Sequence, residues 1–245
     1  MASIHFPRTA ENPPLRWENV RSVVTSQIQQ DGSHIWPFDP TFPVDVRSFT
    51  FPTDHNRPLT RHDYFELLYV YSGRARYQFE GREFTAEEND LIVINGSIYH
   101  RLSEVLDRPF KAVVLYFLPD VFRATESTGE DIQYMMPFLL QDSTFPHIIS
   151  RRSGIPTQVF SLITKIRSQV PAVTDRARLA ARTYLAMILV LLINHYESHL
   201  ALTSAFDRRR RAFDRLRPLF DYLEGHYPEP ISLSTATEIV GMSKA

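Results

Sequence analysis

The first half of the chain alternates hydrophobic and polar positions with the period of β-strands. Five segments follow this pattern and are rich in β-branched and aromatic residues: 44–51, 64–72, 74–80, 90–94 and 110–118. Gly73 and Gly81 separate neighbouring segments with almost no loop, as the tight turns of antiparallel hairpins do. The pattern therefore predicts a β-barrel or sandwich built from many short antiparallel strands.

From residue 156 the hydrophobic period changes to that of an α-helix. Apolar residues recur at spacings of three and four and predict one apolar stripe: Val159, Leu162, Ile163 and Ile166. A second helix is predicted to begin near Asp175 and to end after His195 and His199. The fold class expected from both halves is α+β.

The middle of the second predicted helix is apolar on nearly every side. Its most apolar run covers residues 184–193, which is too short for a bilayer crossing of about 20 residues. We therefore expect a buried helix that the β-domain covers on one side and a second subunit covers on the other. The residues predicted at that dimer contact are Leu185, Leu189 and Leu192.

Composition narrows the class of protein without identifying it. The 245 residues are 43% hydrophobic and 22% charged, with a formal net charge of −1, as in ordinary globular proteins. There is no cysteine, which excludes disulfides, thiolate metal sites and a cysteine nucleophile. The first residues lack the basic-then-apolar pattern of a secretion signal. We therefore expect a cytoplasmic protein that does not enter a membrane.

The last forty residues have a different character from the rest of the chain. Four consecutive arginines, Arg208, Arg209, Arg210 and Arg211, begin a segment that is rich in positive charge. Such a run is typical either of a solvated helix face or of a helix that faces nucleic-acid phosphates. The segments that follow it favour the second interpretation.

The end of the chain has the outline of a helix-turn-helix motif. Ser232 is placed as the N-cap of a short helix, and Gly241 is placed as the left-handed residue that ends it. Ser243 is then placed as the N-cap of a second helix. A capped helix, a glycine turn and another capped helix form the pattern of a DNA-binding motif.

The stretch "LFDYLEGHYPEPISLSTATEIVGMSKA" resembles the opening of the DNA-binding domain of AraC/XylS-type transcription regulators. The resemblance implies that Lys244 and Ala245 begin a recognition helix whose remainder is absent, so that this chain is expected to bind DNA weakly or not at all. Thr237 departs from the family pattern, which usually has alanine there. The residues expected to contact DNA are Arg208, Arg209, Arg210, Arg211, Ser243 and Lys244.

The stretch "RHDYFELLYVYSGRARYQFEGREFTAEENDLIVINGSIYHRL" is similar to the cupin-type sensor domain at the N-terminus of the same regulators. The cupin metal pattern places two histidines, a glutamate and a distant histidine inside the barrel. His62, Glu66 and His100 match three of these positions, and Thr60 takes the fourth. Strand parity independently places His62, Tyr64 and Glu66 on one face.

This constellation leaves three hypotheses open. Two histidines and a carboxylate could hold a metal ion with open positions, as in a cupin oxygenase or isomerase. The histidines could also be surface residues or merely hydrogen-bonded. The hypothesis that we prefer is a pocket without metal or other cofactor that binds a polar effector, such as a sugar. Its predicted ligand contacts are His62, Tyr64, Glu66, His100 and Trp36.

The sequence thus predicts a regulator that is not an enzyme, in three parts. Residues 1–150 form an effector-binding barrel, residues 151–203 a helical dimerisation region, and residues 204–245 a linker helix with an incomplete helix-turn-helix. The predicted partners are a small-molecule effector, DNA in the full-length protein and a second copy of the chain.

Overall fold

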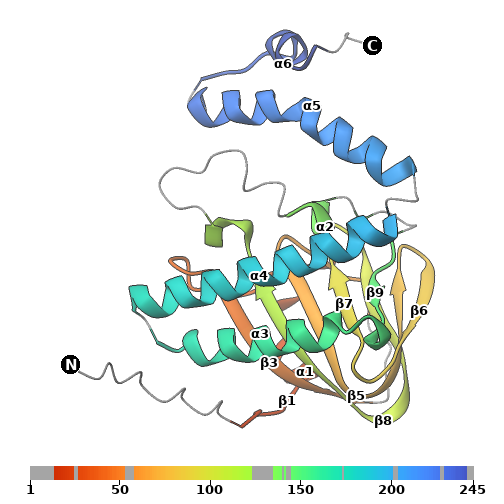
Figure 1. The fold of residues 1–245 in the computed structure, drawn as a ribbon. Coiled ribbons are helices and arrows are strands. Elements are labelled where there is room, and N and C mark those ends of the chain that lie inside the picture. Colours follow the sequence, from red (N-terminus) through yellow and green to blue (C-terminus); the bar gives the residue numbers. More distant parts are fainter. Residues whose placement is uncertain are drawn as a thin grey trace, which may run out of the picture.

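The computed structural model describes residues 14–24, 27–52, 58–122, 135–139, 141, 145–172, 174–200, 204–226 and 229–241. A β-sheet domain forms the first part, two helices cover one face of its sheet, and two further helices follow (Figure 1). The strands are β1 Glu18–Asn19, β2 Ser33–His34, β3 Val44–Phe51, β4 Arg61–His62, β5 Phe65–Phe79, β6 Arg82–Ala86, β7 Leu91–Ile94, β8 His100–Phe117 and β9 Ile148–Ile149. The helices are α1 Val20–Val24, α2 Met136–Leu139, α3 Ile155–Gln169, α4 Asp175–Leu200, α5 Ser204–His226 and α6 Leu233–Val240. The α+β class predicted from the sequence is confirmed.

The main sheet has the strand order β1-β3-β8-β5-β7-β9, with β6 paired to the second half of β5. All pairings between its long strands are antiparallel, as predicted. The order runs from one end strand to the other and does not return, so the predicted β-barrel is an open one. A separate pair of short parallel strands, β2 and β4, lies apart from this sheet.

Two predicted strands on either side of Gly73 are in fact one bent strand, β5. The glycine has a φ of +83°, and a Cβ atom there would lie 2.7 Å from the carbonyl oxygen of Asp107 on β8. Glycine is therefore needed for close backbone approach at a bend and does not mark a loop. The β5–β8 pairing shifts register several times around this point, as β-bulges do in bent sheets.

Residue alternation along β5 gives the sheet two buried faces. Phe65, Leu67 and Tyr69 belong to a core between the sheet and the helices, whereas Leu68 and Val70 belong to a second core on the inner face. Because the strand bends back, residues of its second half such as Tyr77 and Phe79 join the same inner core. The parity predicted from the sequence is confirmed.

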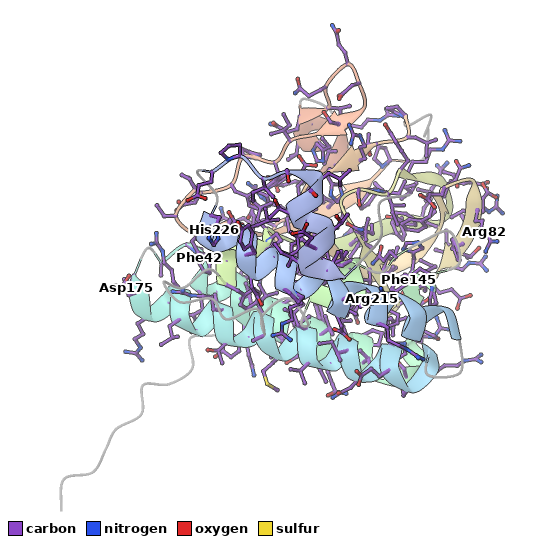
Figure 2. The ribbon with its side chains drawn as sticks, turned by 90° about the horizontal axis from the view of Figure 1, so that it is seen from above. Phe42, Arg82, Phe145, Asp175, Arg215 and His226 are labelled. Atoms are coloured by element: carbon purple, nitrogen blue, oxygen red, sulfur yellow. The ribbon has the colours of Figure 1, made fainter. Side chains whose placement is uncertain are left out.

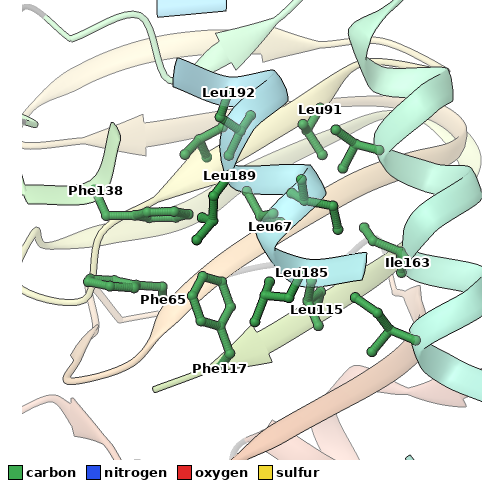
Figure 3. Close-up of a cluster of buried hydrophobic side chains, with 14 of the residues drawn as sticks. Phe65, Leu67, Leu91, Leu115, Phe117, Phe138, Ile163, Leu185, Leu189 and Leu192 are labelled. Carbon is green, nitrogen blue, oxygen red and sulfur yellow. The ribbon is translucent and has the colours of Figure 1, made fainter. Parts of the chain in front are cut away.

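Helix α4 packs one face onto the outer side of the sheet. Leu185, Leu189 and Leu192 are at most 1% exposed and lie in the core with Leu67 of β5 and Ile163 of α3 (Figure 3). The dimer contact predicted for these three leucines therefore needs correction, because their side chains are covered within their own chain. Any contact with a second copy must use the opposite face of α4.

Helix α4 is also long and apolar enough, over Asp175–Ser198, to cross a membrane by length and composition alone. This apolar stretch is longer than the ten-residue run recognised in the sequence. Leu185, Leu189 and Leu192 nevertheless pack in one core with the β-sheet and α3, which is the arrangement of a core helix in a folded domain. We therefore interpret α4 as a core helix with one uncovered face.

Helices α5 and α6 form a hairpin above the layer of α3 and α4 (Figure 1), and Figure 2 looks down on it with Arg215 and His226 labelled on α5. The Ser232 hydroxyl accepts a hydrogen bond from the Thr235 backbone N–H at 3.0 Å, so its prediction as N-cap is confirmed. Gly241 ends α6 in the left-handed conformation, with φ of 62°, also as predicted. The predicted N-cap Ser243 lies outside the described residues.

His147 lies in the core and links the start of β9 to β7 by a hydrogen bond. Its ring stacks on Phe79 with 4.0 Å between the ring centroids, and its Nδ1 donates a hydrogen bond to the Val93 carbonyl. Burial lowers the pKa of this imidazole to about 4, so the ring is neutral in the folded protein at neutral pH. His147 lies immediately before β9.

Candidate functional site

The inner face of the sheet encloses a cavity of about 540 Å³. Strands β2, β4, β5 and β8 supply most of its polar side chains, and α1 covers one side with Val20 and Val24. Most of the remaining wall is apolar. The lining residues central to the argument are His34, His62, Tyr64, Glu66, Leu68, Ile94, His100, Val114 and Tyr116.

His62 and His100 are brought together by backbone contacts between distant segments. The His62 backbone N–H donates to the Gly96 carbonyl at 2.7 Å, and Thr60 and His100 exchange two backbone hydrogen bonds. Gly96 lies so close to β4 that a Cβ atom on it would be 2.2 Å from the His62 carbonyl oxygen. The lack of a side chain at Gly96 therefore allows β4 to approach this closely, and this close approach positions His62.

Glu66 lies between the two histidines. Its Oε2 is 3.2 Å from Nε2 of His62 and 4.0 Å from Nε2 of His100. All three residues are buried, with at most 8% of each residue exposed. The structure thus brings together three of the five residues that the sequence predicted at the ligand site.

The contacts of the two Nδ1 atoms show which ring nitrogen of each histidine carries the proton. Nδ1 of His62 contacts the Tyr64 carbonyl oxygen at 2.7 Å, and Nδ1 of His100 contacts the Ile98 carbonyl oxygen at 2.9 Å. A carbonyl oxygen only accepts hydrogen bonds, so both Nδ1 atoms carry the proton. In the neutral rings the Nε2 atoms, which face Glu66, are therefore acceptors.

Burial keeps the ionisable rings of the cavity neutral. It lowers the pKa of His62 and of His100 to about 4, and the neighbouring His62 lowers that of His100 further. Burial also raises the pKa of Tyr64 and Tyr116 well above the usual range of a phenol. At neutral pH these four side chains offer hydrogen-bonding atoms and ring faces without formal charge.

Tyr64 is held by two aromatic neighbours. Its ring stacks on His62, with 3.8 Å between centroids, and its hydroxyl shares a hydrogen bond with Nδ1 of His34. This tyrosine was predicted as a ligand contact, and it does line the cavity. His34 was missed at the sequence level because it lies in an irregular, proline-rich stretch without periodicity.

Tyr116 was also missed, although a signal for it existed. It pairs directly with Glu66 across the β5–β8 ladder, so the two side chains share the inner face of the sheet. The alternation of the segment 110–118 places Val114 and Tyr116 on the same side. Only the strand register, which the sequence did not provide, connects that side with Glu66.

Trp36 does not occupy the position predicted for it. Its indole Nε1 donates to Asp45 Oδ2 at 3.0 Å, and its ring packs on Tyr116 with 4.5 Å between centroids. It is absent from the cavity lining. The predicted ligand contact of Trp36 is therefore corrected, because the indole supports Tyr116 from behind.

His62, Glu66 and His100 also have the composition of a metal site. Their ligand atoms all lie within 4.8 Å of one another. Each Nδ1 donates to a backbone carbonyl, which is the usual outer contact of metal-binding histidines. Thr60, at the fourth position of the pattern, contributes backbone pairing with His100 and a 3.5 Å contact from its hydroxyl to the His100 carbonyl. The residues present could therefore hold a divalent ion through three ligands.

Of the predicted DNA contacts, the four arginines lie within α5, and Arg211 is exposed. The structure describes no side-chain environment for Arg208, Arg209 and Arg210. Ser243 and Lys244 lie outside the described residues. These contacts stay predictions.

Comparison with known proteins agrees with this picture of a ligand-binding domain. The family described as the AraC-like ligand binding domain matches residues 43–154, which include His62, Glu66, His100 and the main strands of the sheet. The resemblance recognised from the sequence is thereby confirmed as a similarity: residues 43–154 are similar to AraC-like ligand binding domains. The truncation predicted for the DNA-binding part is not tested by this match.

Two curated relatives carry regulator names. An uncharacterized HTH-type transcriptional regulator, YbfI, of Bacillus subtilis (strain 168) is 22% identical over 185 residues, which are 75% of this chain and 60% of the relative. The HTH-type transcriptional activator RhaS of Enterobacter sp. (strain 638) is 24% identical over 193 residues, 79% of this chain and 62% of the relative. The matched part of the chain thus spans about three fifths of the length of these relatives.

Among solved structures, the AraC-like transcriptional activator CuxR is similar with a TM-score of 0.35 and 11% sequence identity. The similarity covers 82% of this chain and 64% of CuxR.

Replacing Gly96 by alanine should destabilise the domain, because the new Cβ atom must displace the carbonyls of His62 and Tyr64. We expect a loss of at least about 2 kcal/mol in the free energy of unfolding, measured by urea denaturation. Gly225→Ala in α5 is the control: nothing lies within 4 Å of its Cβ position, so its effect should stay within about 1 kcal/mol. Equal midpoints for the two variants would contradict the close approach at Gly96.

Three buried histidines should make folding sensitive to acid. The pKa of His62, His100 and His147 is about 4 in the folded protein and about 6.5 in an unfolded chain. Between these values the unfolded chain binds more protons, so the free energy of unfolding falls as pH drops from 6.5 toward 4. The full slope is about 1.4 kcal/mol per pH unit for each histidine.

Denaturation at several pH values, compared with the variant His147→Phe, measures this effect. The phenylalanine keeps the stacking on Phe79 but cannot take up a proton. The slope between pH 6 and pH 4.5 should therefore fall by about one third. An unchanged slope would mean that His147 is not neutral in the folded protein.

Proposed function

We propose that this chain is the sensory part of a transcription regulator that binds a small polar effector in the cavity. The observation that carries the proposal is a cavity of about 540 Å³, in the part of the chain that is similar to AraC-like ligand binding domains, with polar atoms of three buried residues converging in it. A volume in this range suits a molecule of small-metabolite size. A sugar or related polyol was the candidate class inferred from the sequence, on the general ground that hydroxyls can donate to and accept from histidine, tyrosine and carboxylate groups.

The proposed route of the signal runs through the sheet. Glu66 and Leu68 line the cavity, whereas their neighbour Leu67 packs against α4 on the other side of the same strand. A ligand that shifts the inner face of β5 therefore also shifts the residues of β5 on which α4 packs. Such a ligand regulates only if it binds two conformations with different affinity.

The proposed dimer contact is the uncovered face of α4. Leu179, Thr183, Ala186 and Val190 recur at spacings of four, three and four and are all exposed, with Leu179 63% exposed and Val190 37%. This is the heptad spacing of a coiled-coil seam, and its small central residues permit close helix approach. A second copy of the same helix presents the same seam, as a two-fold dimer requires.

DNA binding is proposed for the full-length protein, with α5 and α6 as its beginning. Support comes from the arginine run in α5, the confirmed caps of α6 and the regulator names of both curated relatives. The proposed contacts are the six residues named from the sequence: Arg208, Arg209, Arg210, Arg211, Ser243 and Lys244. The cytoplasm is the compartment proposed for such a protein, since its DNA target is there.

A metal-dependent cupin enzyme is the second candidate. One observation favours it, namely the cluster of His62, Glu66 and His100. Both curated relatives are named as regulators, which favours the sensor. The two candidates differ in what the purified chain should contain.

Native mass spectrometry of the purified chain, before exposure to chelator, tests the sensor function. We expect either a co-purified organic molecule or one that binds from a metabolite mixture and stabilises the fold. A ligand at one hundred times its Kd adds about 2.7 kcal/mol to the free energy of unfolding. Leu68→Phe, which enlarges a buried lining residue, should abolish that stabilisation, whereas Glu83→Gln on the exposed strand β6 should not.

One transition-metal ion per chain, lost in His62→Ala and His100→Ala, would instead favour the enzyme. In that case we expect no organic molecule bound to the purified chain.

The dimer is tested by placing a charge in the seam. Val190→Glu should convert a dimer at micromolar concentration into a monomer, because two carboxylates would be buried close together at the two-fold contact. Ser161→Glu on the exposed surface of α3 is the matched control and should leave the mass unchanged. Analytical ultracentrifugation distinguishes the two, and a wild-type monomer at 50 μM or an unaffected V190E dimer would refute this contact.

A further inference from the structure

In the innermost part of the cavity two imidazole nitrogens and one carboxylate oxygen converge, and Nε2 of His62 lies at hydrogen-bond distance from Oε2 of Glu66. Nε2 of His62 and Nε2 of His100 have lone pairs directed inward, because the Nδ1 atom of each ring already donates to a backbone carbonyl. Glu66 Oε2 lies 3.2 Å and 4.0 Å from these nitrogens. We call these three atoms the acceptor triad. A ligand group that meets all three must bring several donors to one point.

Neutral hydroxyl groups match this arrangement poorly. A hydroxyl has one hydrogen and two lone pairs, so it can satisfy one atom of the acceptor triad while its lone pairs face the others. A protonated nitrogen has two or three hydrogens and no lone pair. Hydrogen bonds from a charged donor are also about twice as strong as neutral ones.

The walls near the acceptor triad also suit a positive group. The rings of Tyr64 and Tyr116 line the cavity, and Tyr64 stacks on His62. Aromatic faces attract cations electrostatically. Among the described lining residues that are buried, Glu66 carries the one carboxylate and none is a lysine or arginine. Arg21 and Arg101 also line the cavity but are not buried, so the buried part of the described wall holds one carboxylate and no opposing cation.

Part of the remaining cavity wall is apolar. Leu68, Ile94 and Val114 lie next to the acceptor triad on the same face of the sheet and are at most 2% exposed. They can cover a hydrocarbon or aromatic body but offer it no hydrogen bond. The cavity thus combines a small acceptor site with a larger apolar region.

From this arrangement we propose that the effector carries a protonated nitrogen group, such as an ammonium, amidinium or guanidinium, which donates to His62, Glu66 and His100 together, and an apolar body that packs on Leu68, Ile94 and Val114. This inference rests on the proposed function, because it names the chemical class of the effector for the same cavity. It is narrower than a polar molecule in general, since neutral polyols and anions are disfavoured.

The test uses three small probes that share one ring and differ in charge: benzamidine, which is protonated at neutral pH, benzyl alcohol and benzoate. Binding to the whole purified chain is measured by calorimetry at pH 7.5, after treatment with EDTA. We expect benzamidine to bind about tenfold tighter than benzyl alcohol, and benzoate to bind more weakly than either.

Glu66→Gln supplies the decisive comparison, because it keeps the shape of the side chain and removes its charge. In this variant the preference for benzamidine over benzyl alcohol should fall to about threefold or less. Glu83→Gln on β6 removes an exposed carboxylate and should leave the tenfold preference intact. Circular dichroism confirms that both variants fold.

Three results would overturn the inference alone. Benzyl alcohol or benzoate could bind as tightly as benzamidine, or the preference for benzamidine could survive unchanged in E66Q. A zinc or manganese ion could also bind stoichiometrically before EDTA treatment and exclude benzamidine, which would assign the acceptor triad to a metal. If no probe and no metabolite of any charge binds to the cavity, the inference and the proposed function fail together.

Discussion

The pairing of the two longest strands, β5 and β8, is the contact on which the rest of the structure depends. Fifteen and eighteen residues long, they pair along almost their whole length and bend together at Gly73. Because of the bend, the two halves of the β5–β8 pair share one inner face. A sheet that does not close can thereby enclose a cavity, with one core inside and a second core beneath the helices.

Burial of both sheet faces connects the cavity with the helix layer. Neighbouring residues of β5 point alternately to the acceptor triad and to α4, so the two regions share a backbone. Close-packed protein interiors transmit displacements instead of absorbing them. A ligand-binding domain with this architecture has a short mechanical path from its ligand to the helix face that we propose as the dimer contact.

The chemistry of the site follows from what surrounds the histidines. Backbone carbonyls determine the position of each proton, and burial keeps the rings neutral. The same residues could ligate a metal ion or accept hydrogen bonds from an organic cation, because both partners need electron pairs from neutral imidazoles and a carboxylate. The apolar wall beside the acceptor triad favours the organic partner, since a bare ion makes no use of it.

Local properties of this protein were predictable from the sequence alone. Residue alternation identified the strand 44–51 exactly and the inward face of Glu66, and helical spacing identified the buried stripe of α3. Ser232 and Gly241 were recognised as helix caps because capping depends on residues only three or four positions away. Strand parity gave the face of Glu66, whereas contacts between distant segments bring His62 and His100 to it.

The tertiary structure alone decided the features that depend on contacts between distant segments. Gly73 is a bend and not a turn because of the β8 backbone that passes beside it. Leu185, Leu189 and Leu192 face the sheet and not a partner, because helical periodicity shows that a residue is apolar but not which surface covers it. Trp36 lies behind Tyr116, and His34 and Tyr116 join the cavity, through register and packing that no local pattern encodes. A sequence determines which way side chains point along an element, whereas only the folded chain determines what they meet.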